Sequence, residues 1–99
     1  PGVRYVDGGR NIETVAVGGG ACAEELAQVA ALGCEAFVTA DVKYNAFADA
    51  AALGVTLIDA GHFETENPVC AVLAEKLRAA LPELEVFVSK MHADPIKFA

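Results

Sequence analysis

Side chains that can bind a metal ion follow the third apolar segment of the sequence. Asp59, His62 and Glu66 come directly after the largely β-branched run at residues 55–58. An imidazole nitrogen and a carboxylate oxygen are ligands that suit zinc, iron and manganese. Two such ligands are too few for a tight site, so others must come from elsewhere in this chain or from another chain. The alternative is a solvated loop histidine and a glutamate that favours the dipole of the next helix.

The local structure around His62 and Glu66 decides whether the two can act together. Their four-residue spacing would place both side chains on one helical face if this stretch is helical. Asn67 and Pro68, however, are typical of an N-cap and a first helical turn. We therefore expect the helix to begin there and both residues to lie in the loop before it.

Three more charged residues lie near the ends of predicted strands. Asp59 ends a predicted buried strand, where an unpaired charge would be costly, so it should accept backbone hydrogen bonds or orient the ring of His62. Asp41 and Lys43 follow the preceding strand. They could form a structural ion pair, or they could supply a carboxylate behind the metal ligands and a cation for an anionic substrate.

A glycine run and a cysteine precede the first predicted helix. The backbone amides of Gly18, Gly19 and Gly20 could form a phosphate-binding cradle. The sequence has neither a G-x-G-x-x-G pattern nor the Lys-Ser or Lys-Thr pair of a P-loop, and close packing of a helix on a strand explains the glycines equally well. Cys22 could be an activated nucleophile, although a free cysteine is usually a small buried hydrophobe. The remaining candidates are expected to be structural: Cys34 and Cys70 in the core, and His92 at the surface.

Strand-like and helical patterns alternate along the chain. Apolar segments at residues 15–17, 36–39 and 55–58 are separated by helical patterns near residues 21–32 and 44–53, each of which stops at a glycine. A third helical pattern runs from Val69 to Leu81 and stops at Pro82. Alternation at residues 83–89 predicts a final strand, and residues 3–6 predict one at the start.

These elements predict a single three-layer α/β domain, with three helices and a mostly parallel sheet of four to five strands. The carboxyl ends of parallel strands meet at one edge of a sheet. The loops at residues 18–20, 41–43 and 59–66 should therefore converge in a binding crevice.

Length, composition and charge limit the class of protein. The chain has 99 residues, of which 55% are hydrophobic and 21% charged, which permits one modest core and excludes disorder. No apolar stretch approaches the roughly 20 residues of a membrane span. The formal net charge of -7 argues against a nucleic-acid partner. The three cysteines lack the spacing of a disulfide framework or a zinc knuckle, so we expect a cytoplasmic protein. The chain begins at Pro1 and not at Met, so we expect a cut made in a longer protein, and without a basic-then-apolar leader nothing argues for secretion.

Four motifs of the sequence occur together in a known family. They are Val15–Gly20, Thr39–Tyr44, Asp59–Glu66 and Asp94-Pro95. Their order and spacing resemble the C-terminal part of the NGG-one-interacting-factor-three-like family, whose members are often called type 2 homologues of GTP cyclohydrolase I. The resemblance covers nearly the whole chain, and its third motif is the most specific.

The resemblance implies a dinuclear metal site in a cleft between two α/β halves, of which residues 1–99 would be the C-terminal one. Two divalent metal ions (zinc, iron or manganese) and a toroidal homohexamer are implied as well. The family's Gly-His-x-x-x-Glu motif carries over to His62 and Glu66 as metal ligands. A histidine pair and an aspartate would come from the other half, so this chain alone should bind metal weakly or not at all. Asp41 and Lys43 match a motif near the site and are expected in the cleft. Asn45 stands where members commonly have a histidine, which puts any role at that position in doubt.

Three functions follow as hypotheses. The first is a metal-dependent hydrolase acting on GTP or on another nucleotide-like or phosphorylated small molecule, with metals activating a water and Glu66 as a possible general base. The second is a non-enzymatic metal-binding module of a ring assembly. The third is a nucleotide- or phosphate-binding domain that uses the glycine run.

Overall fold

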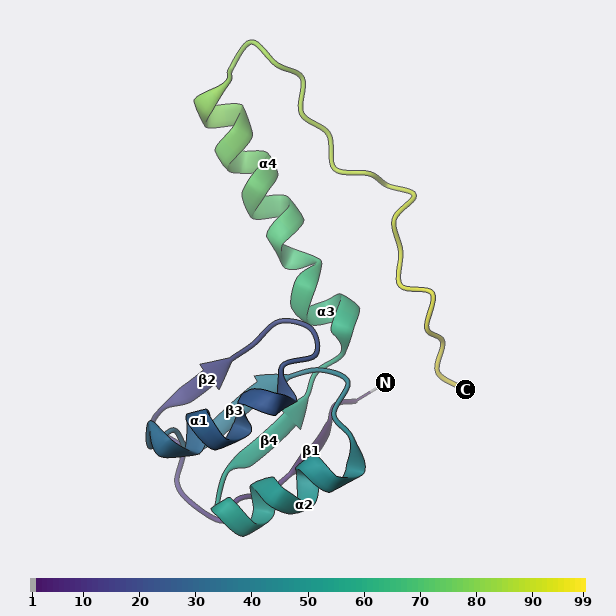
Figure 1. Ribbon diagram of the computed structural model, residues 1–99. Helices are drawn as coiled ribbons and strands as arrows, with labels where there is room; N and C mark the ends of the chain where they lie inside the picture. Colours follow the sequence, from purple (N-terminus) through teal and green to yellow (C-terminus); the bar gives the residue numbers. More distant parts are fainter. Residues whose placement is uncertain (1) are drawn as a thin grey trace.

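A computed structural model describes residues 2–99; Pro1, where we expected the cut from a longer protein, lies outside the described residues. One sheet contains the strands β1 (Arg4–Val6), β2 (Val15–Val17), β3 (Ala36–Thr39) and β4 (Thr56–Asp59). Their order is β1-β4-β3-β2 (Figure 1). β2, β3 and β4 are parallel, and β1 pairs antiparallel with β4. The predicted α/β fold with a mostly parallel sheet is confirmed, with four strands.

The helical segments match the three predicted patterns, with one additional short helix, α3. They are the 3-10 turn η1 (Ala23–Glu25), α1 (Leu26–Ala31), α2 (Tyr44–Leu53), α3 (His62–Glu66) and α4 (Pro68–Ala80). Gly54 ends α2 in the left-handed conformation with φ 70°, and its N–H donates to the last carbonyls of that helix. None of the helices described in residues 2–99 is long and apolar enough to cross a membrane.

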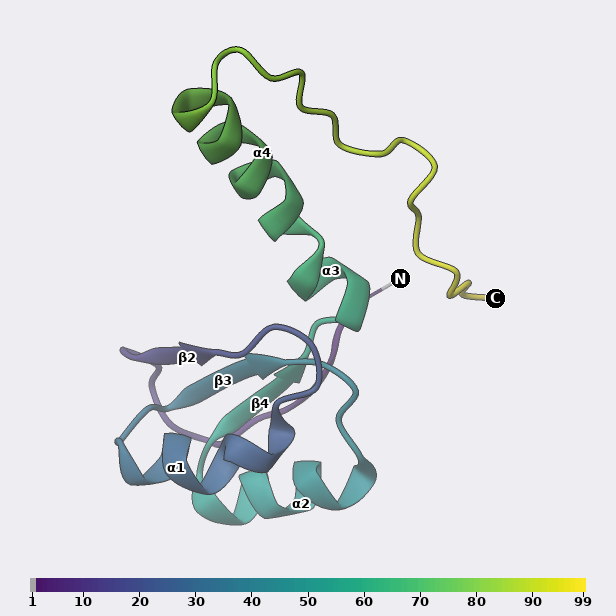
Figure 2. The same cartoon turned by 45° about the horizontal axis from the view of Figure 1, so that its top comes forward.

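The sheet is covered on one face only, so the described residues form two layers where we expected three. α1 and α2 lie on the same side of the sheet (Figure 2). The strand order explains this, because β2, β3 and β4 follow one another in a single direction across the sheet. Right-handed crossovers that advance in one direction place every helix on the same face. The opposite face exposes apolar side chains, among them Tyr5, Val15 and Val17.

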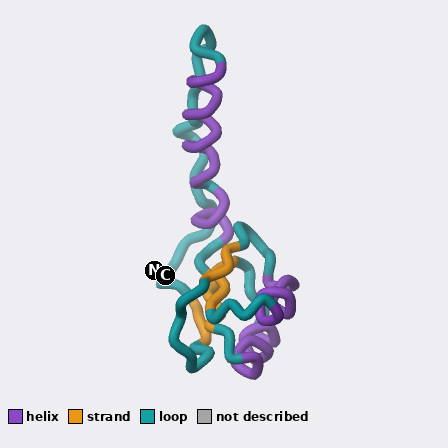
Figure 3. Tube along the Cα trace, turned by 90° about the vertical axis from the view of Figure 1, so that its left-hand side faces the viewer, coloured by secondary structure: helices purple, strands orange, loops and turns teal. Residues whose placement is uncertain are grey.

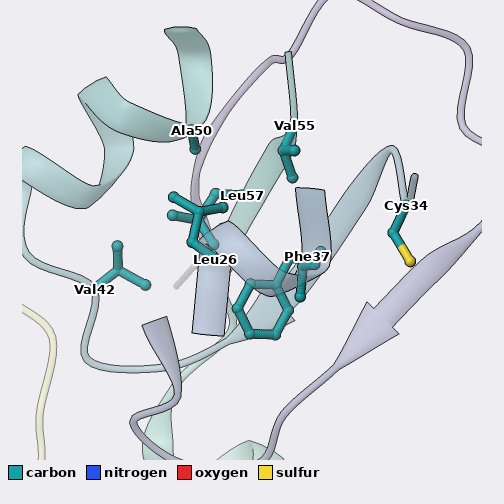
Figure 4. Close-up of a cluster of buried hydrophobic side chains, with 8 residues drawn as sticks. Leu26, Cys34, Phe37, Val42, Ala50, Val55 and Leu57 are labelled. Atoms are coloured by element: carbon teal, nitrogen blue, oxygen red, sulfur yellow. The ribbon is translucent and has the colours of Figure 1, made fainter. Parts of the chain in front are cut away.

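The core lies between the sheet and these two helices. Phe37 and Leu57 are neighbours on β3 and β4 and point toward the helices. Figure 4 shows them packed with side chains from α1, α2 and the connecting loops. The core cluster consists of Leu26, Val29, Cys34, Phe37, Val42, Ala50, Val55 and Leu57. The core prediction for Cys34 is therefore confirmed, whereas Cys70 is only half-buried.

The predicted final strand at residues 83–89 is wrong. Apart from a turn after α4, this segment has no regular structure and pairs with no strand of the sheet. Figure 3 shows α4 projecting away from the sheet and the chain after it turning back alongside the helix, so the alternating segment pairs with no strand. The radius of gyration is 16.6 Å, against about 13 Å for a compact domain of 100 residues. The molecule is elongated because of this projection.

The expectation that His62 and Glu66 lie in a loop is also wrong. Both belong to α3, a short helix that begins after Gly61 at φ 89°. Asn67 has helical backbone angles, so it joins α3 to α4 and does not cap a new helix from an extended conformation. Pro68 is tolerated at the first position of α4 because that position needs no amide hydrogen bond.

Candidate metal-binding site

The three loops predicted to converge do meet at the carboxyl edge of the parallel strands. The amide of Gly20 donates to Thr65 Oγ1 at 2.9 Å, which joins the glycine run to α3. The hydroxyl of Thr39 donates to the carbonyl of Gly20 at 2.8 Å. Asp41 Oδ2 lies 2.7 Å from Nδ1 of His62. These contacts place the ends of β2, β3 and β4 around one small polar cluster.

His62 and Glu66 face each other on one side of α3. Nε2 of His62 lies 3.1 Å from Oε2 of Glu66, the geometry of residues one helical turn apart. Two ligands about 2.1 Å from one ion at a tetrahedral angle lie about 3.4 Å apart. The separation of these two atoms is close to this value, and it is also that of a direct hydrogen bond between the two side chains.

Asp41 forms a hydrogen bond with Nδ1, the other nitrogen of the His62 ring. It has a positive φ of 53°, the only such value among the non-glycine residues described. An imidazole whose Nδ1–H donates to a carboxylate has its Nε2 lone pair free for a cation. Asp41 therefore performs the orienting role that we had considered for Asp59. The hydrogen bond with Asp41, and then the negative charge of Glu66, raise the pKa of His62 above its ordinary value.

Gly20 makes room for the pair. It has φ 68°, and a Cβ at this position would overlap the carboxylate of Glu66 and come within 3.2 Å of Nε2 of His62. A side chain at position 20 would thus displace one or both of the predicted ligands. The close approach of Gly20 to α3 therefore explains why position 20 is a glycine.

Asp59 shapes the loop after β4. Its carboxylate accepts hydrogen bonds from the amides of Val42 at 3.1 Å and Gly61 at 3.2 Å, and it forms an ion pair with Arg4. Burial opposes ionisation, but these hydrogen bonds and the charge of Arg4 together keep the pKa of Asp59 below its ordinary value. Asp59 makes no contact with His62 among the hydrogen bonds of the described residues.

Lys43 stands apart from the cluster. It is exposed at the start of α2, and none of the ion pairs found in residues 2–99 includes it, so no ion pair joins it to Asp41. Both residues line a groove of about 700 Å³ between α1 and α2.

The glycine run uses much of its hydrogen-bonding capacity within the protein. The amide of Gly18 donates to the carbonyl of Val38 at 2.9 Å, and that of Gly20 is bound to Thr65. Cys22 donates its thiol to the carbonyl of Gly19 at 3.3 Å, and its amide donates to Thr39. These internal partners weigh against a phosphate cradle on the same amides.

His92 was expected at the surface with no role, but it lies near this cluster. The ring of His92 lies 5.1 Å from that of Phe63, the residue after His62. His92 and Asp94 also line a cavity of about 470 Å³ together with His62 and Glu66. The Asp94-Pro95 motif could have indicated that this segment belongs to the site. Its position in space, however, depends on how the chain after α4 folds back, which the motif does not predict.

His62 and Glu66 are two candidate metal ligands and do not make a complete site. No group of three or more His, Cys, Asp or Glu side chains in residues 2–99 is arranged to hold a metal ion. Asp41 and Glu66 lie at opposite nitrogens of the same ring, so the two carboxylates do not face a common point. Further ligands would have to come from outside the described residues.

Comparison with known proteins gives a consistent set of relatives. A "GTP cyclohydrolase 1 type 2 homolog" of Nostoc is 47% identical over 68 residues, covering 69% of this chain and 26% of the relative. The protein of the same name from Clostridium acetobutylicum is 32% identical, over 97% of this chain and 38% of the relative. The crystal structure of Staphylococcus aureus protein SA1388 superimposes with a TM-score of 0.85 at 28% identity, covering all of this chain and 30% of that one.

The chain thus spans between about a quarter and two fifths of the length of these relatives. The family model described as Duf34/NIF3 (NGG1p interacting factor 3) matches residues 1–95. This match takes in both the sheet and the segment that carries Asp94, so the chain belongs to the DUF34/NIF3 family.

Proposed function

We propose that this chain supplies one side of a metal-binding site, with His62 and Glu66 as ligands. The observation that carries the proposal is the approach of Nε2 to Oε2 at 3.1 Å. With Nδ1–H donating to Asp41, a neutral His62 offers only a lone pair at Nε2, and a carboxylate offers only lone pairs. Two acceptors at this distance need a cation between them, and a divalent metal ion or a proton fills that need.

The proposal extends to two ions whose other ligands lie in the rest of a longer protein. The family resemblance supports this, and so does the short span of this chain relative to its relatives. An imidazole and a carboxylate together suit zinc, iron or manganese.

We propose hydrolysis of a nucleotide-like or other phosphorylated small molecule as the activity of such a site, in line with the names of the relatives. A bound metal would supply a Lewis acid for this reaction. In this chain Asp41 would keep the ring of His62 in the correct tautomer. Glu66 would be the carboxylate that accepts a proton. Lys43, which lies in the adjoining groove with Asp41, would offer a cation to an anionic substrate that extends into that groove.

Metal content tests the ligand assignment. Elemental analysis of the longer protein that contains this chain should show stoichiometric metal, which His62→Ala and Glu66→Gln each reduce strongly. Glu64→Gln is the matched control, since Glu64 is exposed on the same helix and faces neither residue. Equal metal content in all four proteins would contradict the assignment.

Substitution of Asp41 should have a smaller effect on metal affinity than loss of His62 or Glu66. Loss of a carboxylate behind a ligating histidine typically weakens metal binding about 10- to 100-fold. We predict a loss in this range for Asp41→Asn, measured by competition with a chromophoric chelator. Asp49→Asn is the control, because Asp49 is exposed on α2 away from His62. An unchanged affinity would show that Asp41 has only a structural role.

A non-enzymatic assembly module is the second candidate, and one observation favours it. Several apolar side chains of α4, among them Val72, Leu73 and Leu77, are about half exposed. Exposed apolar surface of this kind marks an interface. Oligomers that depend on metal, combined with no turnover on a panel of nucleotides and phosphate esters, would favour this function over the hydrolase.

A further inference from the structure

We infer that the cavity between α3 and residues 92–96 binds the aromatic ring of a small molecule whose oxygen donors reach His62 and Glu66. The cavity has a volume of about 470 Å³, within the range of about 300–1,000 Å³ that is typical of ligand sites. The oxygen-donor part of this inference rests on the proposed metal-binding function, whereas the ring-binding part does not.

The lining of the cavity is suited to a flat apolar group. Phe63, Val69 and Ile96 contribute apolar surface, and they come from α3, α4 and the C-terminal segment, respectively. The rings of Phe63 and His92 lie 5.1 Å apart with an interplanar angle of 40°, so two aromatic side chains already pack at this wall. Aromatic groups at such separations interact favourably beyond their buried area.

The charges in the lining determine where the polar part of the ligand lies. His62 and Glu66 line the same cavity as the apolar residues, so a ligand inside it reaches the proposed metal ligands. The carboxylates of Glu66 and Asp94 would repel an anion in the absence of a metal. We therefore assign the cavity to a neutral ring that carries a metal-binding oxygen group.

Two hydroxamates with the same metal-binding group separate the two parts of this inference. Benzohydroxamate carries a phenyl ring where acetohydroxamate carries a methyl group. Binding of each to the longer protein that contains this chain would be measured by ¹H–¹⁵N NMR titration, with and without zinc. We expect benzohydroxamate to bind about tenfold more tightly in both conditions, with amide shifts at residues 63, 69, 70 and 96.

Matched variants on the C-terminal segment locate the ring. Ile96→Ser should reduce the preference for benzohydroxamate to about twofold or less, and Phe98→Ser should leave it unchanged. Both side chains are exposed, at 57% and 64%, but only Ile96 lines the cavity. Because neither belongs to the core, the fold should be retained, and circular dichroism checks this.

Different results would overturn the two proposals. Equal affinities for the two hydroxamates, no binding of either, or a preference that survives Ile96→Ser would each contradict the ring pocket. A ring preference that persists while zinc strengthens neither hydroxamate would support the pocket and count against the metal-binding function.

Discussion

Residues 4–60, the sheet unit, and residues 68–99, the C-terminal arm, have similar shares of apolar residues but very different burial. All but one of the buried hydrophobic residues lie in the sheet unit, and the exception is Ala74 in α4. The arm carries leucine, valine and phenylalanine side chains that stay largely exposed, among them Leu73, Leu84 and Phe87. Apolar periodicity is thus enough to indicate a helix such as α4, whereas a strand and the burial of apolar side chains both require a partner surface.

The candidate site lies where these two regions meet. α3 begins at the end of β4 in the sheet unit and continues into α4 of the arm. His62 contacts Asp41 of the sheet unit, and Phe63 contacts His92 of the arm. The sheet unit supplies a rigid edge, and the arm supplies the far wall of the cavity.

The largest expected difference between the regions is in stability. Leu57→Ala should lower the free energy of unfolding by about 3 kcal/mol, because Leu57 is fully buried at 0% exposure and its truncation leaves a cavity. Leu77→Ala is the matched substitution in α4, where the side chain is 46% exposed, and it should cost less than about 1 kcal/mol. Urea denaturation measures both. Equal losses would mean that the arm packs as tightly as the sheet unit.

A second, smaller effect depends on pH. The pKa of Asp59 is lower in the folded chain than its ordinary value. Its hydrogen bonds thus stabilise the fold above the unfolded pKa of about 3.9, and this contribution is lost as the pH falls through the folded pKa. Asp59→Asn should cost about 2 kcal/mol at pH 7, and the difference from the unsubstituted chain should shrink below about pH 4.

The control for this prediction is Asp49→Asn, which removes an exposed carboxylate of α2. Its unfolding free energy should follow that of the unsubstituted chain over the same pH range. A cost for Asp59→Asn that stays constant from pH 7 to pH 3 would contradict the assigned role of its carboxylate.

The smallest expected change in stability compares two glycines with positive φ. Alanine at either Gly20 or Gly33 adopts a left-handed conformation, which costs about 1 kcal/mol. A Cβ at Gly33 meets nothing within 4 Å, whereas one at Gly20 overlaps the carboxylate of Glu66. Both variants should lose similar stability, but only Gly20→Ala should weaken zinc binding by the longer protein that contains this chain. Similar zinc affinity in the two variants would show that Gly20 does not make room for the ligands.

The sequence predicted the sheet unit well because its signals are local. β-branched runs mark the strands, and Gly54 ends α2 where the pattern stops. The convergence of the three loops followed from parallel strand order alone. The two-layer arrangement could not be predicted from local signals. It depends on the order of β2, β3 and β4 across the sheet, which places both helices on one face.

The prediction failed where the outcome depends on distant parts of the chain. Residues 83–89 alternate like a strand but find no strand edge to pair with. Asn67 and Pro68 predict the start of a helix, which would leave His62 in a loop. In the structure Asn67 has helical backbone angles and joins α3 to α4. The contact of Asp41 with His62 depends on a positive φ at a non-glycine residue, which no local pattern indicated.

The nitrogen resonances of the His62 ring test the proposed metal ligation most directly. Long-range ¹H–¹⁵N spectra of the longer protein that contains this chain would be recorded with and without an excess of zinc. We predict that zinc shifts the resonance of Nε2 of His62, while Nδ1 keeps its proton and its hydrogen bond to Asp41. Glu66→Gln should reduce the zinc-induced shift of Nε2. A response at Nδ1, or none at either nitrogen, would contradict the assignment of His62 as a metal ligand.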